Sequence, residues 1–423
     1  MRKFVISMEL EGAKRHTKFF KTLKEYCKHN KAELILLNEL TEELKLNNNL
    51  TLCPIKLNHN NIDPISGLDG LATVKGNIIV GGPRHRFKTI PRSLKYQKTP
   101  TGIWMTGSIS LPIGQYKDNK SGLSMRGFHK VGALVVEVQD DEIFHVRQLS
   151  CSNTKGRMYD LDKLYYHSGK VETRQIDGLV IGDLHPPFID KSALNKTLDF
   201  ISKYTPKYLI YHDIFDAVSI SHWLSDKFID KATNHIKSLK QELELTKEIL
   251  SKFIYASPKS KHISCESNHN LHLNRYINEF RFKEDYTNLE LALNIALQQV
   301  KSKYTKINVL EYALSLVYPN YKLPIIFLNE KDTYTVAGND ISSHGHAGAN
   351  GAKGNPKSFG AAFKSNVVTA HTHSSEIGPL GNYVAGTLTV LSMPYCQDSG
   401  MSSWMHSNVI IYADGEKSHY HMV

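Results

Sequence analysis

The sequence predicts an α/β protein with two parts. The length of 423 residues exceeds that of one typical domain. Apolar runs of strand length alternate with segments of helical period along most of the chain. The charge also divides unevenly, because residues 1–175 carry 28 Lys and Arg against 17 Asp and Glu, whereas residues 176–423 carry 24 of each. We therefore expect a smaller, basic α/β domain at 1–150, a linker or flap at 151–176, and a larger domain at 177–423.

The N-terminal part opens with a β-α-β pattern. Apolar residues at 4–6 and 34–37 flank a segment of helical period at 14–31. This pattern predicts a small α/β unit. Further strand-like runs follow at 77–80, 103–110, 132–138 and 143–148.

The C-terminal part shows the alternation of strands and helices that is typical of a layered α/β domain. A polar stretch at 151–175 without clear periodicity precedes it and predicts the linker or flap. A Gly-rich run at 344–360 predicts a loop. We expect strands at 179–182, 208–211, 262–264 and 383–391, helices at 191–203 and 234–254, and a hairpin at 407–422 that turns at Asp414-Gly415.

The basic excess of the N-terminal part favours a surface that binds a polyanion such as nucleic acid. A Lys-rich surface that is merely solvated explains the same excess equally well. One run mixes cations, which bind phosphates, with aromatic side chains, which stack on bases. It consists of Arg84, Arg86, Lys88, Arg92, Lys95 and Lys98, with Phe87 and Tyr96 among them.

The five cysteines are scattered, without a C-x-x-C pair, which favours a reducing compartment. The N-terminus does not have the pattern of a signal peptide, and no apolar stretch reaches the length of a membrane span. We therefore expect a cytoplasmic protein that does not contact the membrane.

Five short polar motifs each follow a strand-like run of the C-terminal part. The carboxyl ends of strands in an open α/β sheet converge on one crevice, so these side chains are expected to meet. Their carboxylate, amide and imidazole groups suit Mn²⁺, Fe, Zn²⁺ or Mg²⁺ and not a thiolate zinc site. Two ions about 3.5–4 Å apart also need a shared carboxylate. The motifs are Gly182-Asp183-Leu184-His185, His212-Asp213-Ile214-Phe215-Asp216, Ser267-Asn268-His269-Asn270, Ser343-His344-Gly345-His346 and Ala370-His371-Thr372-His373.

In order and spacing the motifs resemble those of the calcineurin-like metallophosphoesterase superfamily, which reads D-x-H, G-D-x-x-D, G-N-H-[DE], a lone H, and G-H-x-H. The resemblance covers most of residues 177–423 and implies two mixed β-sheets packed together and flanked by helices. It also implies two divalent metal ions, with Mn²⁺ favoured over Mg²⁺, Fe or Zn²⁺. By position, it assigns Asp183, His185 and His373 to the first ion, Asn268, His344 and His371 to the second, Asp213 to both as a bridge, and His269 to catalysis.

Several neighbouring residues leave alternatives open. Asp216 completes the second motif, either with a direct role or only as a cap of the following turn. His272 and His346 either contact substrate or lie at the periphery, and Lys353 and Lys357 either approach a phosphate or are solvated. The superfamily's pattern has glycine where this chain has His212, Ser267 and Ala370, and an acidic residue where it has Asn270.

The resemblance implies hydrolysis by a hydroxide held between the ions, with His269 protonating the leaving group. The branch of phosphoprotein phosphatases is disfavoured because Ala217-Val218 follow Asp216 and Asn270 follows His269. The leading hypothesis is a DNA nuclease, since the basic excess adjoins the metal site and the chain resembles phage-encoded DNases, which would act in the host cytoplasm.

Two alternatives remain. One is a nucleotide phosphomonoesterase or cyclic-nucleotide phosphodiesterase, whose N-terminal part would serve in oligomerisation or as a lid. The other is a non-catalytic nucleic-acid-binding protein with a vestigial metal site. A homo-oligomer is compatible with each of them.

Overall fold

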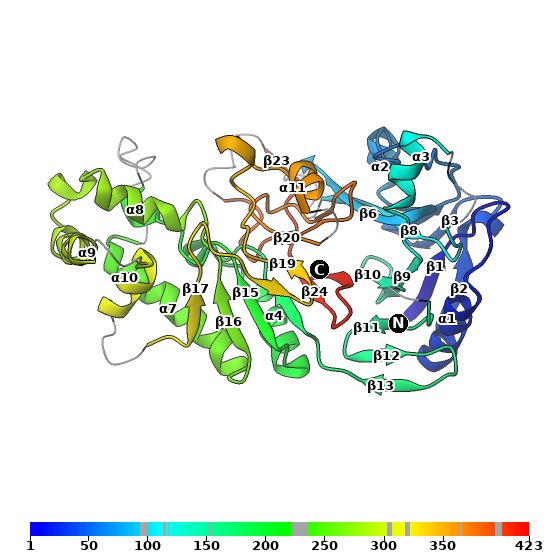
Figure 1. The fold of residues 1–423 in the computed structure, drawn as a ribbon, viewed down its shortest axis with the longest axis horizontal. Coiled ribbons are helices and arrows are strands. Elements are labelled where there is room, and N and C mark those ends of the chain that lie inside the picture. The colour runs from blue at the N-terminus through cyan, green and yellow to red at the C-terminus, as the bar shows by residue number, and fades with distance from the viewer. Residues whose placement is uncertain are drawn as a thin grey trace.

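The computed structural model describes residues 1–93, 100–112, 116, 118–151, 154–221, 236–302, 307–317, 322–363, 366–393 and 400–422. These residues form an α/β structure with several mixed sheets, which confirms the predicted class. Figure 1 shows the helices α7 to α10 gathered at one end of the molecule and the N-terminal strands at the other. Among the described helices, none is both long and apolar enough to span a membrane.

A six-stranded sheet forms the centre of the C-terminal part, in the order β17-β16-β15-β14-β24-β25. Leu179 and Leu209 face the helices, whereas their neighbours Val180 and Ile210 face the other large sheet. Because successive side chains of a strand point to opposite faces, strands buried on both faces read as continuous apolar runs. The strands are β14 (Gly178–Val180), β15 (Tyr208–Tyr211), β16 (Lys261–Ser264) and β17 (Ile325–Phe327), all parallel, and the antiparallel hairpin β24 (Ser407–Ile411) and β25 (Lys417–His421).

Helices cover one face of this sheet and share its apolar core. Two of them begin at residues whose side chains accept a backbone N–H, since Asp190 accepts from Ala193 at 2.9 Å and Ser238 accepts from Gln241 at 3.2 Å. The helices are α4 (Lys191–Tyr204), α7 (Leu239–Ala256), α8 (Asn270–Asn278), α9 (Leu289–Lys301) and α10 (Val309–Val317).

The second large sheet has eight strands, in the order β20-β22-β21-β6-β8-β5-β4-β3. It combines strands from both parts of the chain, which meet where Ile377 of β21 pairs with Phe87 of β6. The range 1–150 therefore shares a sheet with the C-terminal part. Its strands are β3 (Leu44–Asn47), β4 (Leu50–Cys53), β5 (Asn77–Val80), β6 (Gly82–Ile90), β8 (Thr101–Gly107), β20 (Val368–Thr369), β21 (Glu376–Ile377) and β22 (Tyr383–Val384).

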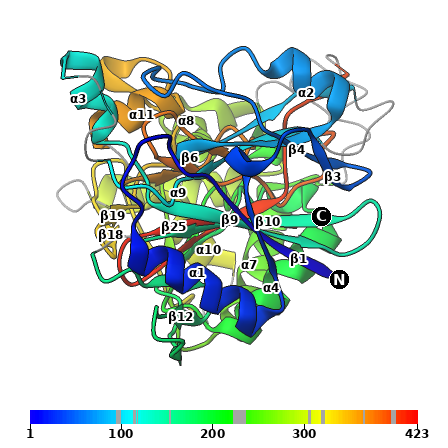
Figure 2. The ribbon, with the colours of Figure 1, turned by 90° about the vertical axis from the view of Figure 1, so that its right-hand side faces the viewer.

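A four-stranded sheet in the order β10-β9-β1-β2 lies at the N-terminal end. The helix α1 packs on it through Phe19 and Leu23, which contact Val5 and Val135 in one core, and Figure 2 shows α1 running roughly alongside β1. The predicted β-α-β opening is thereby confirmed, because β1 and β2 are parallel. The elements are β1 (Arg2–Ser7), α1 (Thr17–Asn30), β2 (Glu33–Leu36), β9 (Gly132–Val138) and β10 (Phe144–Ser150).

Two segments differ from the sequence prediction. The polar stretch at 151–175 contains a small antiparallel sheet, β11 (Met158–Asp160), β12 (Lys163–Tyr165) and β13 (Val171–Thr173). The Gly-rich run contains the helix α11 (Pro356–Phe363), which starts with a proline after Asn355, whose side chain accepts the backbone N–H of Ser358 at 2.9 Å. The remaining described elements are α2 (Asp69–Lys75), α3 (Lys120–Arg126), β7 (Arg92–Ser93), β18 (Thr335–Val336), β19 (Asn339–Asp340) and β23 (Met401–Ser402).

Candidate metal centre

Four of the five motifs follow strands of the two large sheets, and the fourth motif follows β19 of a two-stranded sheet. Asp183, Asp213 and Asn268 follow the carboxyl ends of the neighbouring parallel strands β14, β15 and β16. His371 and His373 follow β20 of the eight-stranded sheet. The candidate centre therefore lies where the carboxyl edge of one sheet meets a strand end of the other, as expected for a site in an α/β protein.

The backbone at these motifs is strained. His185, Asp213, His371 and His373 have φ angles of 38°, 45°, 74° and 58°. A left-handed conformation costs energy for any residue other than glycine, and such residues cluster at functional sites. Four of the seven predicted ligands thus adopt a conformation that local sequence preference does not favour.

The structure brings together the three predicted ligands of the first ion and the predicted bridge. Each of these four residues offers one ligand atom, and the four atoms lie within 4.8 Å of one another. The Nε2 atom of His185 lies 3.1 Å from Nε2 of His373 and 3.2 Å from Oδ2 of Asp213. The Nε2 atom of His373 lies 3.2 Å from Oδ2 of Asp183. Ring nitrogens and carboxylate oxygens therefore converge on one point, which is the arrangement of a metal site.

Several oxygens of this cluster have no hydrogen-bond partner among the described residues. They are Oδ1 of Asp183 and both carboxylate oxygens of Asp213. Asp183 and Asp213 are 0% and 1% exposed. A buried carboxylate without partners costs several kcal/mol, roughly, unless a cation neutralises it. A divalent ion would satisfy all of these atoms, so the residues present fit the metal that the resemblance implies.

Asp216 orients the histidines of the centre. Its Oδ1 atom lies 2.5 Å from Nδ1 of His185. This contact requires a proton on Nδ1, which leaves the lone pair of Nε2 directed at the cluster. Nδ1 of His269 lies 2.9 Å from the backbone oxygen of Asp216 and 3.4 Å from its Oδ1. These contacts favour the direct role of Asp216 over the capping role.

The electrostatic environment keeps Asp213, the predicted bridge, ionised. Burial alone would raise the pKa of Asp213, but the neighbouring His344, His269 and His185 outweigh burial and hold this pKa well below its ordinary value. Burial would lower the pKa of His185, yet the carboxylates of Asp213 and Asp216 raise it well above its ordinary value. The centre therefore binds positive charge strongly at this point, either as protons or as metal ions.

The predicted ligands of the second ion are less tightly gathered. Nε2 of His344 lies 3.2 Å from Oδ2 of Asp213, which places this histidine at the predicted bridge. The rings of His344 and His371 are 5.1 Å apart, and the backbone N–H of His371 donates to Oδ2 of Asp183 at 2.9 Å. Burial lowers the pKa of His371 to about 4, so this imidazole is neutral and able to bind a metal near neutral pH. Oδ1 of Asn268 is buried and has no hydrogen-bond partner among the described residues.

The predicted catalytic histidine lies beside the cluster. The ring of His269 is 4.5 Å from that of His185 and 5.5 Å from that of His272, and its side chain is partly exposed. The ring of His346 lies 5.6 Å from that of His344. Lys353 is exposed, and the side chain of Lys357 lies outside the described residues.

The basic run of the N-terminal part does not form the predicted surface where the structure describes it. Arg84 and Arg86 are each 4% exposed. Arg84 donates to the backbone oxygens of His59, Asn61 and Ile62. Arg86 pairs with Asp63 and Glu376, and Lys88 pairs with Asp69. Arg92 donates to Thr101, Ala72 and Thr73, and Phe87 is fully buried. Lys95, Tyr96 and Lys98 lie outside the described residues.

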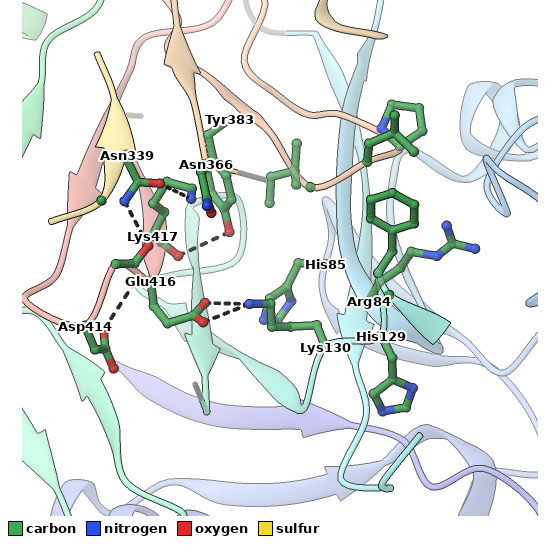
Figure 3. A pocket seen from close by; sticks show the side chains of 18 of the residues that line it. Arg84, His85, His129, Lys130, Asn339, Asn366, Tyr383, Asp414, Glu416 and Lys417 are labelled. Carbon is green, nitrogen blue, oxygen red and sulfur yellow. Dashed lines mark hydrogen bonds and ion pairs between the residues drawn. The ribbon is translucent and has the colours of Figure 1, made fainter. Parts of the chain in front are cut away.

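A polar cavity of about 280 Å³ lies between the two parts of the chain, apart from the Asp/His cluster. Figure 3 shows Lys130 and Glu416 in direct contact in its lining. The two carboxylate oxygens of Glu416 each accept from Nζ of Lys130 at 2.8 Å, and Lys417 donates to Oδ1 of Asn339 at 2.6 Å. The first pair joins the C-terminal hairpin to the N-terminal part, and the second joins the hairpin to β19, so we assign both a structural role.

Sequence reasoning missed two residues near the centre. Glu242 of α7 is buried and accepts hydrogen bonds from the backbone of Val218 and Ser219, in the turn that follows Asp216. Trp404 packs its indole ring against His373, with ring centroids 4.2 Å apart. Neither lies in a motif, because each reaches the centre through tertiary packing.

Comparison with known proteins gives one informative similarity. The chain is 32% identical over 373 residues to Protein A1 of Escherichia phage T5. The match includes 84% of this chain but spans only 65% of the length of Protein A1. No family model matches the sequence, and no solved structure matches it.

Proposed function

We propose that this protein is a two-metal phosphodiesterase that hydrolyses the backbone of DNA. The observation that carries the proposal is the buried ligand set of Asp183, His185, Asp213 and His373, in which both oxygens of Asp213 lack a hydrogen-bond partner among the described residues. Such a set needs cations, and its mixture of nitrogen and oxygen ligands suits the hydrolytic metals Mn²⁺, Fe and Zn²⁺.

The residues of the chain divide the work. When bound, a pair of divalent ions would neutralise the phosphate oxygens and lower the pKa of an attacking water. Asp213 would hold both ions, since His185 and His344 approach its Oδ2 atom from two directions. His269, which is partly exposed and hydrogen-bonded to the backbone of Asp216, would donate a proton to the leaving oxygen.

Two observations support a polyanionic substrate. The N-terminal part carries the entire basic excess of the chain and shares the eight-stranded sheet with β20, which leads into the ligand loop. The similarity to a phage protein supports a phage origin, for which host or phage DNA is an abundant phosphodiester. The resemblance of the motifs to the metallophosphoesterase superfamily supports the reaction type and the fold.

The test is incubation of the metal-replete protein with linear and circular DNA and, in parallel, with nucleotides and a cyclic nucleotide. We expect cleavage of DNA, which Asp213→Ala and His269→Ala abolish. His167→Ala serves as the matched control, because His167 lies at the turn between β12 and β13, away from the cluster. Hydrolysis of nucleotides without cleavage of DNA would instead indicate a small-molecule phosphoesterase. Metal binding without hydrolysis of DNA or nucleotides would contradict a catalytic role.

A further inference from the structure

Trp404 stands beside the candidate metal centre without belonging to any motif. Its indole ring is 4.2 Å from the ring of His373, at an interplanar angle of 68°. His373 is 5% exposed, whereas Trp404 is only partly buried. Trp404 therefore contacts a predicted ligand and lies, partly exposed, at the edge of the candidate site.

The chain holds this indole in place by backbone and side-chain bonds. The N–H of Met405 donates to the backbone oxygen of His373 at 3.0 Å. The hydroxyls of Ser403 and Ser374 are 2.7 Å apart. The segment of Trp404 is thus fastened to the loop that carries His371 and His373, on both sides of the indole.

The same segment is also bound to the N-terminal part. β23 pairs with β7, so that Met401 lies opposite Ser93 and Ser402 opposite Arg92. The backbone N–H of Trp404 donates to Oγ of Ser402 at 3.1 Å, which stabilises the turn between β23 and Trp404. Because both ends of the segment are fixed, Trp404 is presented as a preorganised surface rather than a side chain on a free loop.

We propose that Trp404 stacks on the base of an unpaired nucleotide next to the phosphodiester that is cleaved. Aromatic side chains bind single strands in this way, since every base has a π-face, and such stacking tolerates any sequence. A base inside a duplex is already stacked on its neighbours, so an indole at this distance from the metal centre selects single-stranded or locally unpaired polynucleotide. The identity of the substrate as a polynucleotide rests on the function proposed above.

A merely structural role is the competing explanation, in which Trp404 only holds the ring of His373. The two roles differ in what a substitution changes. Loss of a stacking surface raises KM for a substrate that carries bases and leaves kcat nearly unchanged. Loss of support for His373 lowers kcat or metal affinity for every substrate, whether or not it carries bases.

The experiment compares three proteins on two substrates. Wild type, Trp404→Phe and Trp404→Ala, all metal-replete, cleave a single-stranded oligonucleotide and a matched one with abasic residues around the cleaved bond. We expect Trp404→Ala to raise KM for the base-bearing strand roughly tenfold, Trp404→Phe to raise it less, and all three proteins to have the same KM on the abasic strand. Tyr255→Ala is the matched control, because Tyr255 is 89% exposed at the end of α7, before the amino-terminal end of β16.

A binding measurement keeps this inference separate from the proposed function. Nuclease-resistant phosphorothioate oligonucleotides are titrated into wild type and Trp404→Phe, and the difference in tryptophan fluorescence reports on Trp404. We expect quenching by the base-bearing strand and not by the abasic one. Quenching without cleavage of any DNA would support stacking by Trp404 and contradict the proposed nuclease activity. Cleavage of DNA with equal KM values for wild type and Trp404→Ala would support the nuclease activity and overturn stacking by Trp404. A fall in kcat on both substrates alike would assign Trp404 to the support of His373.

Discussion

Two buried clusters of charge behave in opposite ways. In the N-terminal sheet, Arg147 donates to both carboxylate oxygens of Asp160, at 2.8 and 3.1 Å, and to Glu137 at 2.7 Å. Asp160 also accepts from the hydroxyl of Tyr26 at 2.7 Å. Among the described residues, every buried side-chain nitrogen or oxygen of Arg147, Asp160 and Glu137 has a hydrogen-bond partner. By contrast, three buried carboxylate oxygens of Asp183 and Asp213 in the C-terminal part have no hydrogen-bond partner.

This difference in hydrogen bonding distinguishes buried charges that stabilise the fold from buried charges that could bind a ligand. A buried ion pair whose hydrogen bonds are complete needs nothing further, and its removal harms only stability. A buried carboxylate pair whose oxygens are unsatisfied is stable only when cations arrive from outside. The first cluster therefore stabilises the N-terminal sheet, and the second could hold a metal ion.

The largest expected effect on metal binding is at the predicted bridge. Asp213→Asn removes the carboxylate on which His185 and His344 converge, so the protein should lose its stabilisation by metal ions. For a ligand at 100 times its Kd this stabilisation is about 2.7 kcal/mol. Thermal unfolding with and without Mn²⁺ measures it. An unchanged metal-dependent increase in Tm would show that Asp213 is not a ligand.

The opposite pattern is expected at the N-terminal cluster. Arg147→Met leaves Asp160 buried without its cationic partner and should reduce the free energy of unfolding by about 3–5 kcal/mol. The increase in the free energy of unfolding on addition of Mn²⁺ should stay the same, because Arg147 lies in β10 and not at the candidate metal centre. Urea unfolding measures both quantities. Lys163→Met is the control: Lys163 pairs with Asp162 at the surface, where an ion pair contributes about 0–1 kcal/mol.

A substitution at Asp216 tests whether a carboxylate beside the candidate metal centre also supports metal binding. Asp216→Asn keeps an oxygen that accepts from Nδ1 of His185 but removes the charge. The loss of an orienting carboxylate typically reduces metal affinity or activity about 10–100-fold. Calorimetric titration with Mn²⁺ and initial rates of hydrolysis both check this. Asp190→Asn should change neither, because asparagine also caps a helix and Asp190 acts at the start of α4.

The elements and motifs that depend on local pattern could be predicted from the sequence. The strands β5, β9 and β15 were predicted at their observed bounds, because period-2 alternation or a fully apolar run leaves few alternatives. The five motifs were predicted because each follows such a strand. The gathering of Asp183 and Asp213 then follows from the convergence of neighbouring strand ends, whereas His373 joins them from a strand of the other large sheet.

The contacts that depend on long-range pairing could not be predicted. Arg86 reads as an exposed cation in the sequence, yet its partner Glu376 lies on β21, and only the pairing of β6 with β21 reveals this. The eight-stranded sheet was missed for the same reason, since the register between distant strands is not a local property. The contact of Trp404 with His373 likewise needs the fold.

The smallest expected effect concerns buried histidines outside both clusters. His85 and His419 are 5% and 0% exposed, and burial lowers the pKa of each to about 4. In the unfolded chain a histidine has its ordinary pKa of about 6.5. Above this pH both states are neutral and the folded protein keeps its full stability. Between about pH 6.5 and 4 only the unfolded state binds the proton, so each such histidine costs about 1.4 kcal/mol of stability per pH unit.

The variant His419→Phe isolates one of these contributions. Phenylalanine suits the site because His419 packs between the rings of Phe87 and Tyr383. It abolishes the contact of Nε2 with the backbone oxygen of Val384, at 3.0 Å, which lowers stability by the same amount at every pH. The pH dependence of stability between 6.5 and 5 should nevertheless become shallower by about 1.4 kcal/mol per unit. Urea unfolding in EDTA, which removes the titration linked to metal ions, measures the slope, and equal slopes for variant and wild type would mean that His419 is protonated in the folded state.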